Sequence, residues 1–211
     1  MYENKGVRLE GHSVSSLDKE QVSCCTKSLK QRYIMVDIII TDRLILRNYQ
    51  ETDIENILKL RACPEVWVYS TNKVDYSKEG ALKYWKEVSQ KYIDGKCSFQ
   101  ALFLKDTQEF IGEAGVLAFN EEHNRAVVGY NLLPRFWNRG YATEITKGIV
   151  DKLFYEIEVE RIEGLTSESN IGSRRVLEKS GFRLEGILRH YAKIDNEYQN
   201  VCYYGIIKPD M

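Results

Sequence analysis

The chain has 211 residues, a length that fits one domain of ordinary size with room for a hydrophobic core. Hydrophobic residues make up 43% and charged residues 29%, a mixture typical of folded globular proteins rather than disordered or fibrous ones. The net charge is −1 and the isoelectric point is about 6.4, so no overall basic field indicates a nucleic acid or an anionic membrane as partner.

The cysteines argue against zinc binding and against a disulfide framework. They are odd in number, scattered, and without a CxxC or Cys/His spacing: Cys24, Cys25, Cys63, Cys97 and Cys202. The longest aliphatic run, residues 34–40, is too short to span a bilayer. We therefore expect a cytoplasmic protein without a metal site.

The first residues differ from the remainder of the chain. In residues 1–34 the apolar residues do not recur at a sustained period of 2.0 or 3.6 residues. From Met35 onwards, apolar residues alternate with charged ones. Two interpretations stay open: an accessory arm, or translation from an upstream start codon with Met35 as the physiological initiator, which the pattern favours. Both predict a poorly ordered leader over 1–34 and a single domain over 35–211.

The elements expected after Met35 alternate between strands and helices. The periodicities, the Thr52–Glu55 capping box and the glycine stops predict strands over 43–48, 98–105, 109–119, 125–133, 161–167, 182–194 and 198–207, and helices over 54–61, 77–93, 140–154 and 171–179. This order predicts an α+β domain, a mixed sheet with helices on its faces.

The segment 131–144 joins the end of an expected strand to the start of an expected helix through a short loop. A helix start presents unpaired N–H groups and the positive end of the helix dipole, which suit a phosphate. Gly140 and Ala142 are small enough for a pyrophosphate to approach the backbone, and Arg139 adds a cation. The alternative is an ordinary strand-to-helix turn.

A second segment, 167–182, opens another helix with small polar residues. Asn170 and Ser173 are three residues apart, so they share one helix face. By itself this pattern indicates only a capped helix with an exposed serine.

Together the two segments resemble the GNAT superfamily of acetyltransferases. Residues 138–144 resemble its acyl-CoA pyrophosphate loop, and Asn170 with Ser173 and residues 178–182 resembles its following helix motif. Residues 41–47 look like the opening of the branch that acetylates the N-termini of ribosomal proteins. The resemblance covers about residues 35–208 and implies acetyl-CoA as cosubstrate. It also implies a central, mostly antiparallel sheet of about seven strands with about four flanking helices.

The resemblance implies roles for individual residues. Backbone N–H groups of Leu132 and Leu133 would hold the acetyl oxygen, Ser173 would face the sulfur, and Asn170 would bind the pantetheine arm. The pyrophosphate would lie against Trp137, Asn138, Arg139, Gly140, Tyr141, Ala142 and Thr143. Two departures matter: Trp137 occupies the Gln/Arg place of the loop motif, and Leu177 stands where many relatives carry a tyrosine that acts as general acid.

The general base is not obvious from the sequence. Ala192 stands near a place where a glutamate serves in related enzymes. Glu113, on an expected strand of the same sheet, is the candidate replacement, although a solvated strand carboxylate is the simpler interpretation. His190 and Tyr191 are weaker candidates.

Three functions remain open: acetylation of a protein N-terminus, as in the ribosomal-type branch, acetylation of a small amine such as a polyamine or aminoglycoside, and non-catalytic acyl-CoA binding. An α-amine titrates near ~7.8 and a lysine-like amine near ~10.4. Deprotonation at a pH of about 7.4 therefore costs roughly 0.5 and roughly 4 kcal/mol, respectively. A site without an obvious base favours the N-terminal amine. The expected partner is the acceptor amine, with neither nucleic acid nor membrane, for a monomer or homodimer.

Overall fold

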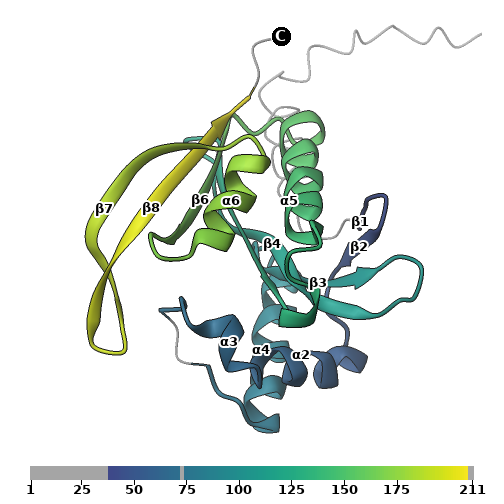
Figure 1. Ribbon diagram of the computed structural model, residues 1–211. Helices are drawn as coiled ribbons and strands as arrows, with labels where there is room; N and C mark the ends of the chain where they lie inside the picture. Colours follow the sequence, from purple (N-terminus) through teal and green to yellow (C-terminus); the bar gives the residue numbers. More distant parts are fainter. Residues whose placement is uncertain (1–37, 72–73, 209–211) are drawn as a thin grey trace, which may run out of the picture.

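The computed structural model describes residues 38–71 and 74–208, so the expected leader over 1–34 lies outside the described residues. The described chain forms one sheet in the order β1-β2-β3-β4-β5-β6-β8-β7 (Figure 1). Its strands are β1 (Ile39–Ile40), β2 (Leu44–Arg47), β3 (Phe99–Leu104), β4 (Phe110–Asn120), β5 (Arg125–Leu132), β6 (Arg161–Ser167), β7 (Arg183–Ile194) and β8 (Glu197–Ile207). All neighbouring strands are antiparallel except β5 and β6.

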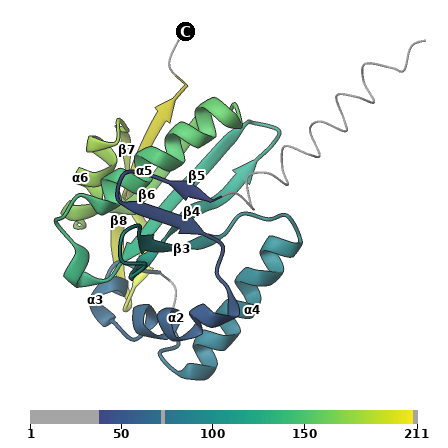
Figure 2. The same ribbon diagram turned by 90° about the vertical axis from the view of Figure 1, so that its right-hand side faces the viewer.

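The helices surround this sheet (Figure 2). They are α2 (Ile54–Arg61), α3 (Pro64–Trp67), α4 (Lys78–Ile93), α5 (Tyr141–Asp151) and α6 (Ile171–Lys179). Two short 3-10 helices, η1 (Glu51–Asp53) and η2 (Pro134–Phe136), and a π-helical segment that continues α5, η3 (Lys152–Glu156), complete the set. The expected fold class, α+β with a mostly antiparallel sheet, is confirmed.

Two short elements, β1 and α3, do not follow from the sequence pattern. The two residues of β1 pair with Leu46 and Ile45 of β2, and the turn at residues 41–43 ends the strand before an alternating pattern is established. The single turn of α3 begins at Pro64, a residue whose fixed φ suits the first helical position. Neither element is long enough to display its own period in the sequence.

Helices α4 and α6 cover opposite faces of the sheet. The Tyr84 hydroxyl of α4 donates to Glu113 of β4 at 2.9 Å, and the Asn131 amide of β5 donates to the same carboxylate at 2.9 Å. The adjacent Tyr130 lies 2.9 Å from the Ser173 hydroxyl of α6. Because consecutive strand residues point to opposite faces, α4 lies on one face and α6 on the other. Helix α5 packs beside α6, and Figure 1 shows the two side by side.

Strands β5 and β6 pair over only part of their length. The parallel register runs from Arg125 opposite Arg161 to Val127 opposite Glu163 and then stops. Beyond that point β5 stays paired with β4 and β6 with β8, so the two strands separate. At the end where the two strands are paired, called here the closed end, the buried Glu163 forms ion pairs of 2.9 Å with Arg125 and 2.8 Å with Arg161.

Candidate active site

The start of α5 lies beyond the open end of β5. Gly140, the residue before the helix, has φ +81°, and Asn138 in the same loop has φ +59°. Both values lie in the left-handed region that glycine and asparagine tolerate best. No side chain caps this helix, and its first backbone bond runs from Glu144 N–H to Gly140 O at 3.0 Å. The N–H groups of residues 141–143 therefore have no carbonyl partner within the helix.

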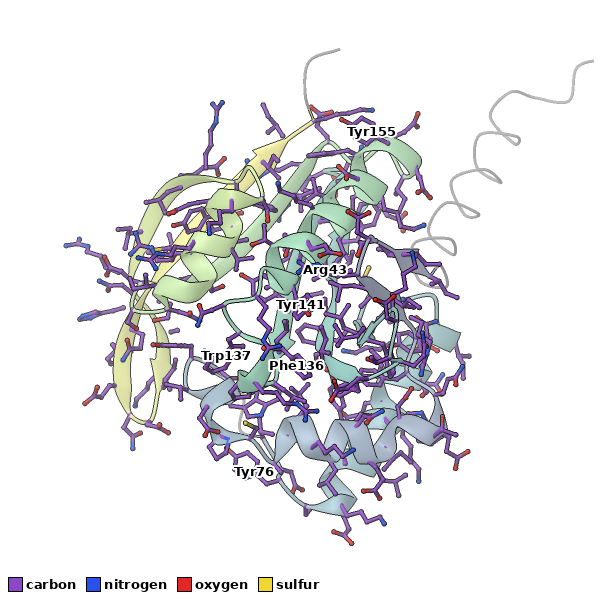
Figure 3. All side chains as sticks on the ribbon, turned by 45° about the vertical axis from the view of Figure 1, so that its right-hand side comes forward. Arg43, Tyr76, Phe136, Trp137, Tyr141 and Tyr155 are labelled. Atoms are coloured by element: carbon purple, nitrogen blue, oxygen red, sulfur yellow. The ribbon has the colours of Figure 1, made fainter. Side chains whose placement is uncertain are left out.

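This helix start suits a phosphate group in both shape and charge. A Cβ atom added at Gly140 would come within 3.5 Å of the Arg43 guanidinium, so a side chain here would project into the space beside the loop. Figure 3 shows Arg43, Tyr141, Phe136 and Trp137 around this end of α5, with Tyr155 towards its other end. The free N–H groups and the helix dipole favour an anion at this position.

At the end of β5, the backbone N–H groups of Leu132 and Leu133 point in opposite directions. The Leu133 N–H donates to Ile111 O of β4 at 2.9 Å and is therefore engaged within the sheet. Because the N–H and C=O groups alternate in direction along an antiparallel strand, those of Leu132 point away from β4, towards the side where β6 has separated. The Leu132 carbonyl accepts the Trp137 indole N–H at 2.6 Å. Of the two expected N–H donors, that of Leu132 faces the opening between the strands.

Ser173 and Asn170 lie at the start of α6. The Asn170 side chain accepts the Ser173 N–H at 3.0 Å and so caps the helix. The Ser173 hydroxyl lies 2.9 Å from that of Tyr130, which also donates to the Ser173 carbonyl at 3.2 Å. Burial raises the pKa of Tyr130 to about 12. No motif in the sequence singles out Tyr130, and only the strand alternation places it on the face opposite Asn131.

Glu113 is buried, with 1% of its surface exposed, so its interpretation as a solvated strand carboxylate is wrong. It lies in the first half of β4, which runs between β3 and β5, and its side chain points towards α4. One carboxylate oxygen accepts the hydroxyls of Tyr49 and Tyr84, both at 2.9 Å, and the other accepts the Asn131 amide at 2.9 Å.

The environment of Glu113 shifts several pKa values. Burial raises the pKa of Glu113, and the three donated hydrogen bonds only partly oppose that shift. Burial, followed by the charge of Glu113, raises the pKa of Tyr49 and of Tyr84 well above the usual value of a tyrosine. Burying a carboxylate with its polar partners in a core is costly, and such clusters occur preferentially at functional sites.

The structure brings most of the expected site residues together. The start of α5, the end of β5 and the start of α6 all border the place where β5 and β6 separate. Glu113 lies on the other face of the sheet, one strand away. His190 and Tyr191 lie on the β7–β8 hairpin, where both side chains are exposed and His190 stacks on Tyr198 with ring centroids 5.6 Å apart.

The described residues contain neither a metal-binding cluster nor a membrane-spanning helix. Over residues 38–71 and 74–208, no three His, Cys, Asp or Glu side chains are grouped so as to hold a metal ion. No helix in that part of the chain is long and apolar enough to cross a membrane.

Comparison with known proteins agrees with this arrangement. Residues 43–183 match the family described as acetyltransferase (GNAT) domain. The chain is 32% identical to an uncharacterized N-acetyltransferase, YoaA of Bacillus subtilis, over 83% of this chain and 99% of that protein. Among solved structures, an acetyltransferase of the GNAT family from Bacillus anthracis superposes with a TM-score of 0.73 at 24% identity, covering 82% of this chain and 99% of that one.

A second solved structure is RimL, a ribosomal alpha-N-protein acetyltransferase in complex with coenzyme A. It has a TM-score of 0.72 at 20% identity and covers 81% of this chain and 98% of its own. At these identities the structural matches establish the fold, while the family match spans most of the described chain. The protein therefore belongs to the GNAT family and is an N-acetyltransferase.

Proposed function

We propose that this protein transfers the acetyl group of acetyl-CoA to the α-amine of a protein N-terminus, by direct attack in a ternary complex. One observation carries the proposal: the opening between β5 and β6 is bordered by the free N–H groups that begin α5, the Leu132 N–H and the Ser173 hydroxyl. The likeness to RimL and the resemblance of residues 41–47 to the ribosomal-type branch support the choice of acceptor.

The residues around this opening fit the cosubstrate. Residues 140–143 would hold the pyrophosphate through backbone N–H groups, with Arg139 exposed beside them to add a positive charge. When bound, acetyl-CoA supplies a thioester whose carbonyl carbon is the point of attack for the amine nitrogen. Leu132 N–H would stabilise the charge that develops on the carbonyl oxygen, a contribution of roughly 3 kcal/mol per donor in comparable sites.

Ser173 would act as a hydrogen-bond donor to the leaving sulfur. The Tyr130 proton can point to the Ser173 hydroxyl oxygen instead of the Ser173 carbonyl, which leaves the serine proton for the sulfur. A thiol has a pKa of roughly 8.5, whereas burial raises the pKa of the hydroxyl of Tyr130, which is bonded to Ser173, to about 12. Both hydroxyls are weaker acids than a thiol, so complete proton transfer from this pair to the sulfur is unfavourable. The pair therefore stabilises the negative sulfur without giving up its proton.

Glu113 is proposed as the base that accepts the proton of the amine. Burial raises the pKa of Glu113, so it lies closer to the pKa of an α-amine than the pKa of an ordinary glutamate does. Because Glu113 is buried, the proton reaches it through a bridging water. Glu113 of β4 is paired with Asn131 of β5, which donates to it, and Asn131 immediately precedes Leu132, so the base and the proposed carbonyl-binding N–H lie on neighbouring strands.

Replacing Ser173 by alanine is expected to lower kcat about tenfold, because losing one hydrogen bond to the leaving group costs about 1.4 kcal/mol. The CoA dissociation constant should stay nearly unchanged. Ser169→Ala is the matched control, since this neighbouring exposed serine bonds to Ser167 at 2.8 Å and does not contact Tyr130. Steady-state kinetics and CoA titration of both variants test this; wild-type turnover in Ser173→Ala would remove the residue from the mechanism.

The acceptor is tested by measuring CoA release from acetyl-CoA with a panel of N-terminal peptides, polyamines and aminoglycosides. We expect the highest kcat/KM with peptides that have a free α-amine, and no reaction when that amine is blocked. Equal rates with a lysine side chain in a blocked peptide would contradict α-amine selectivity. A preference for polyamines or aminoglycosides would replace this acceptor by a small amine while leaving the use of acetyl-CoA intact.

A further inference from the structure

The β1–β2 turn, residues 41–43, is fastened to the first turn of α5. The Thr41 hydroxyl donates to Glu144 Oε1 at 2.6 Å, and the Arg43 backbone N–H donates to the same oxygen at 2.8 Å. The Arg43 Nε donates to the other carboxylate oxygen at 2.6 Å. The Thr41 methyl also lies against α5, because a Cβ atom added at Gly148 would approach it to 3.0 Å.

Beyond Glu144, Arg43 also contacts the loop before α5, residues 138–140, which is proposed to bind the pyrophosphate. Its guanidinium donates to the Arg139 carbonyl at 3.2 Å and lies over the Tyr141 ring, 4.6 Å from the centroid. A Cβ atom added at Gly140 would come within 3.5 Å of the same group. Arg43 therefore contacts the loop before, at and after the left-handed residue, and Figure 3 shows it beside Tyr141.

The charges of Glu144 and Arg43 affect how well an anion can bind at the start of α5. Glu144 lies in the first turn of α5, where its negative charge stands close to the N–H groups proposed to hold the pyrophosphate. Although burial opposes it, hydrogen bonds from Thr41 and Arg43 lower the pKa of Glu144, so the carboxylate is ionised at neutral pH. Without the guanidinium, an uncompensated anion would repel a phosphate at short range.

We propose that Arg43 is a positioning residue for acetyl-CoA binding. It holds the backbone of residues 139–141 in the conformation that presents the N–H groups, and it neutralises Glu144 beside the phosphate position. The inference rests on the proposed use of acetyl-CoA, but it concerns Arg43, which lies outside the loop motif and its helix. It also assigns a physical role to the Thr-Asp-Arg segment that joins β1 to β2.

The test is the dissociation constant of CoA, measured by calorimetry on the purified full chain. Arg43→Ala should weaken CoA binding by about tenfold or more, equivalent to about 1.4 kcal/mol. The kcat at saturating acetyl-CoA should remain close to that of the wild type. Arg135→Ala is the matched control, because Arg135 precedes the same loop and is ion-paired with Glu109 at 2.9 Å, but stacks on Phe136 rather than on residues 139–144.

Two further variants separate positioning from a general loss of stability. Arg43→Lys keeps the charge but cannot reproduce the forked contacts, so CoA binding should be intermediate. The double variant Arg43→Ala/Glu144→Gln should bind CoA more tightly than Arg43→Ala, because the repelling charge is gone. A lower Tm with an unchanged CoA dissociation constant in both Arg43 variants would overturn the inference. Failure of the wild type to bind CoA would overturn the proposed function as well.

Discussion

Glu113→Gln is expected to lower kcat by about 100-fold while leaving the protein folded, because general base catalysis contributes on that order or more. The amide has nearly the shape of the carboxylate. Its oxygen keeps the Tyr49 and Tyr84 hydroxyl bonds, and Asn131 can turn its own amide to accept from the new NH₂ group. Wild-type kcat should rise with pH through the raised pKa of Glu113, and the variant should lose that dependence.

The pH dependence of the stability difference between the same variant and the wild type can also be predicted. A glutamate whose folded-state pKa is raised contributes stability that is present below its unfolded pKa, near ~4.3, and is lost as the pH rises through the folded value. Glu113→Gln removes this contribution, so its Tm relative to the wild type should be higher near neutral pH than in acid. Losing turnover without losing stability would mark Glu113 as a residue retained for chemistry.

Glu163→Gln is the matched control for a buried sheet glutamate. Glu163 is 3% exposed but is ion-paired with Arg125 and Arg161 at the closed end of the strands, and its pKa is lowered. This substitution should reduce stability at neutral pH and leave the pH dependence of kcat in place. If Glu113→Gln turns over like the wild type at every pH, Glu113 is a structural carboxylate and the base lies elsewhere.

Gly140→Asp is expected to weaken CoA binding by about 100-fold or more. The residue has φ +81°, a left-handed conformation that aspartate tolerates better than most side chains, so the loss is expected to come mainly from the new charge. The new carboxylate would also stand before the free N–H groups of α5, where it would cap the helix and repel the pyrophosphate. It would lie close enough to Arg43 to compete with Glu144 for the guanidinium.

Gly140→Asn separates charge from backbone strain, because asparagine is similar in size, neutral and tolerant of the left-handed region. We expect this variant to keep CoA binding within about tenfold of the wild type, a loss of about 1.4 kcal/mol. The measurement is the rise in Tm with CoA concentration, which follows mass action for a ligand of the native state. An undiminished rise in folded Gly140→Asp would show that the phosphate is not held at this helix start.

The sequence predicted most of the fold because its elements are long enough to show their own periods. The α4 helix begins after Ser77, whose hydroxyl accepts the Gly80 N–H at 3.0 Å, and α6 follows the expected bounds. The loop before α5 was recognisable because a glycine between a strand and a helix marks a turn that needs its conformational freedom. Periodicity also separated the strand 125–133 from the helix after it, to within a residue of the observed end of β5.

By itself, the sequence predicted the order of the longer elements, the glycine loop before α5 and the family, because these depend on local periods and short spacings. Only the tertiary structure decided that Glu113 is buried among Tyr49, Tyr84 and Asn131, since those side chains come from separate segments of the chain. It also decided that Arg43 contacts the loop before α5 and Glu144, which is 101 positions away in the chain. Contacts of this range follow from sheet register and helix packing, which no local pattern specifies.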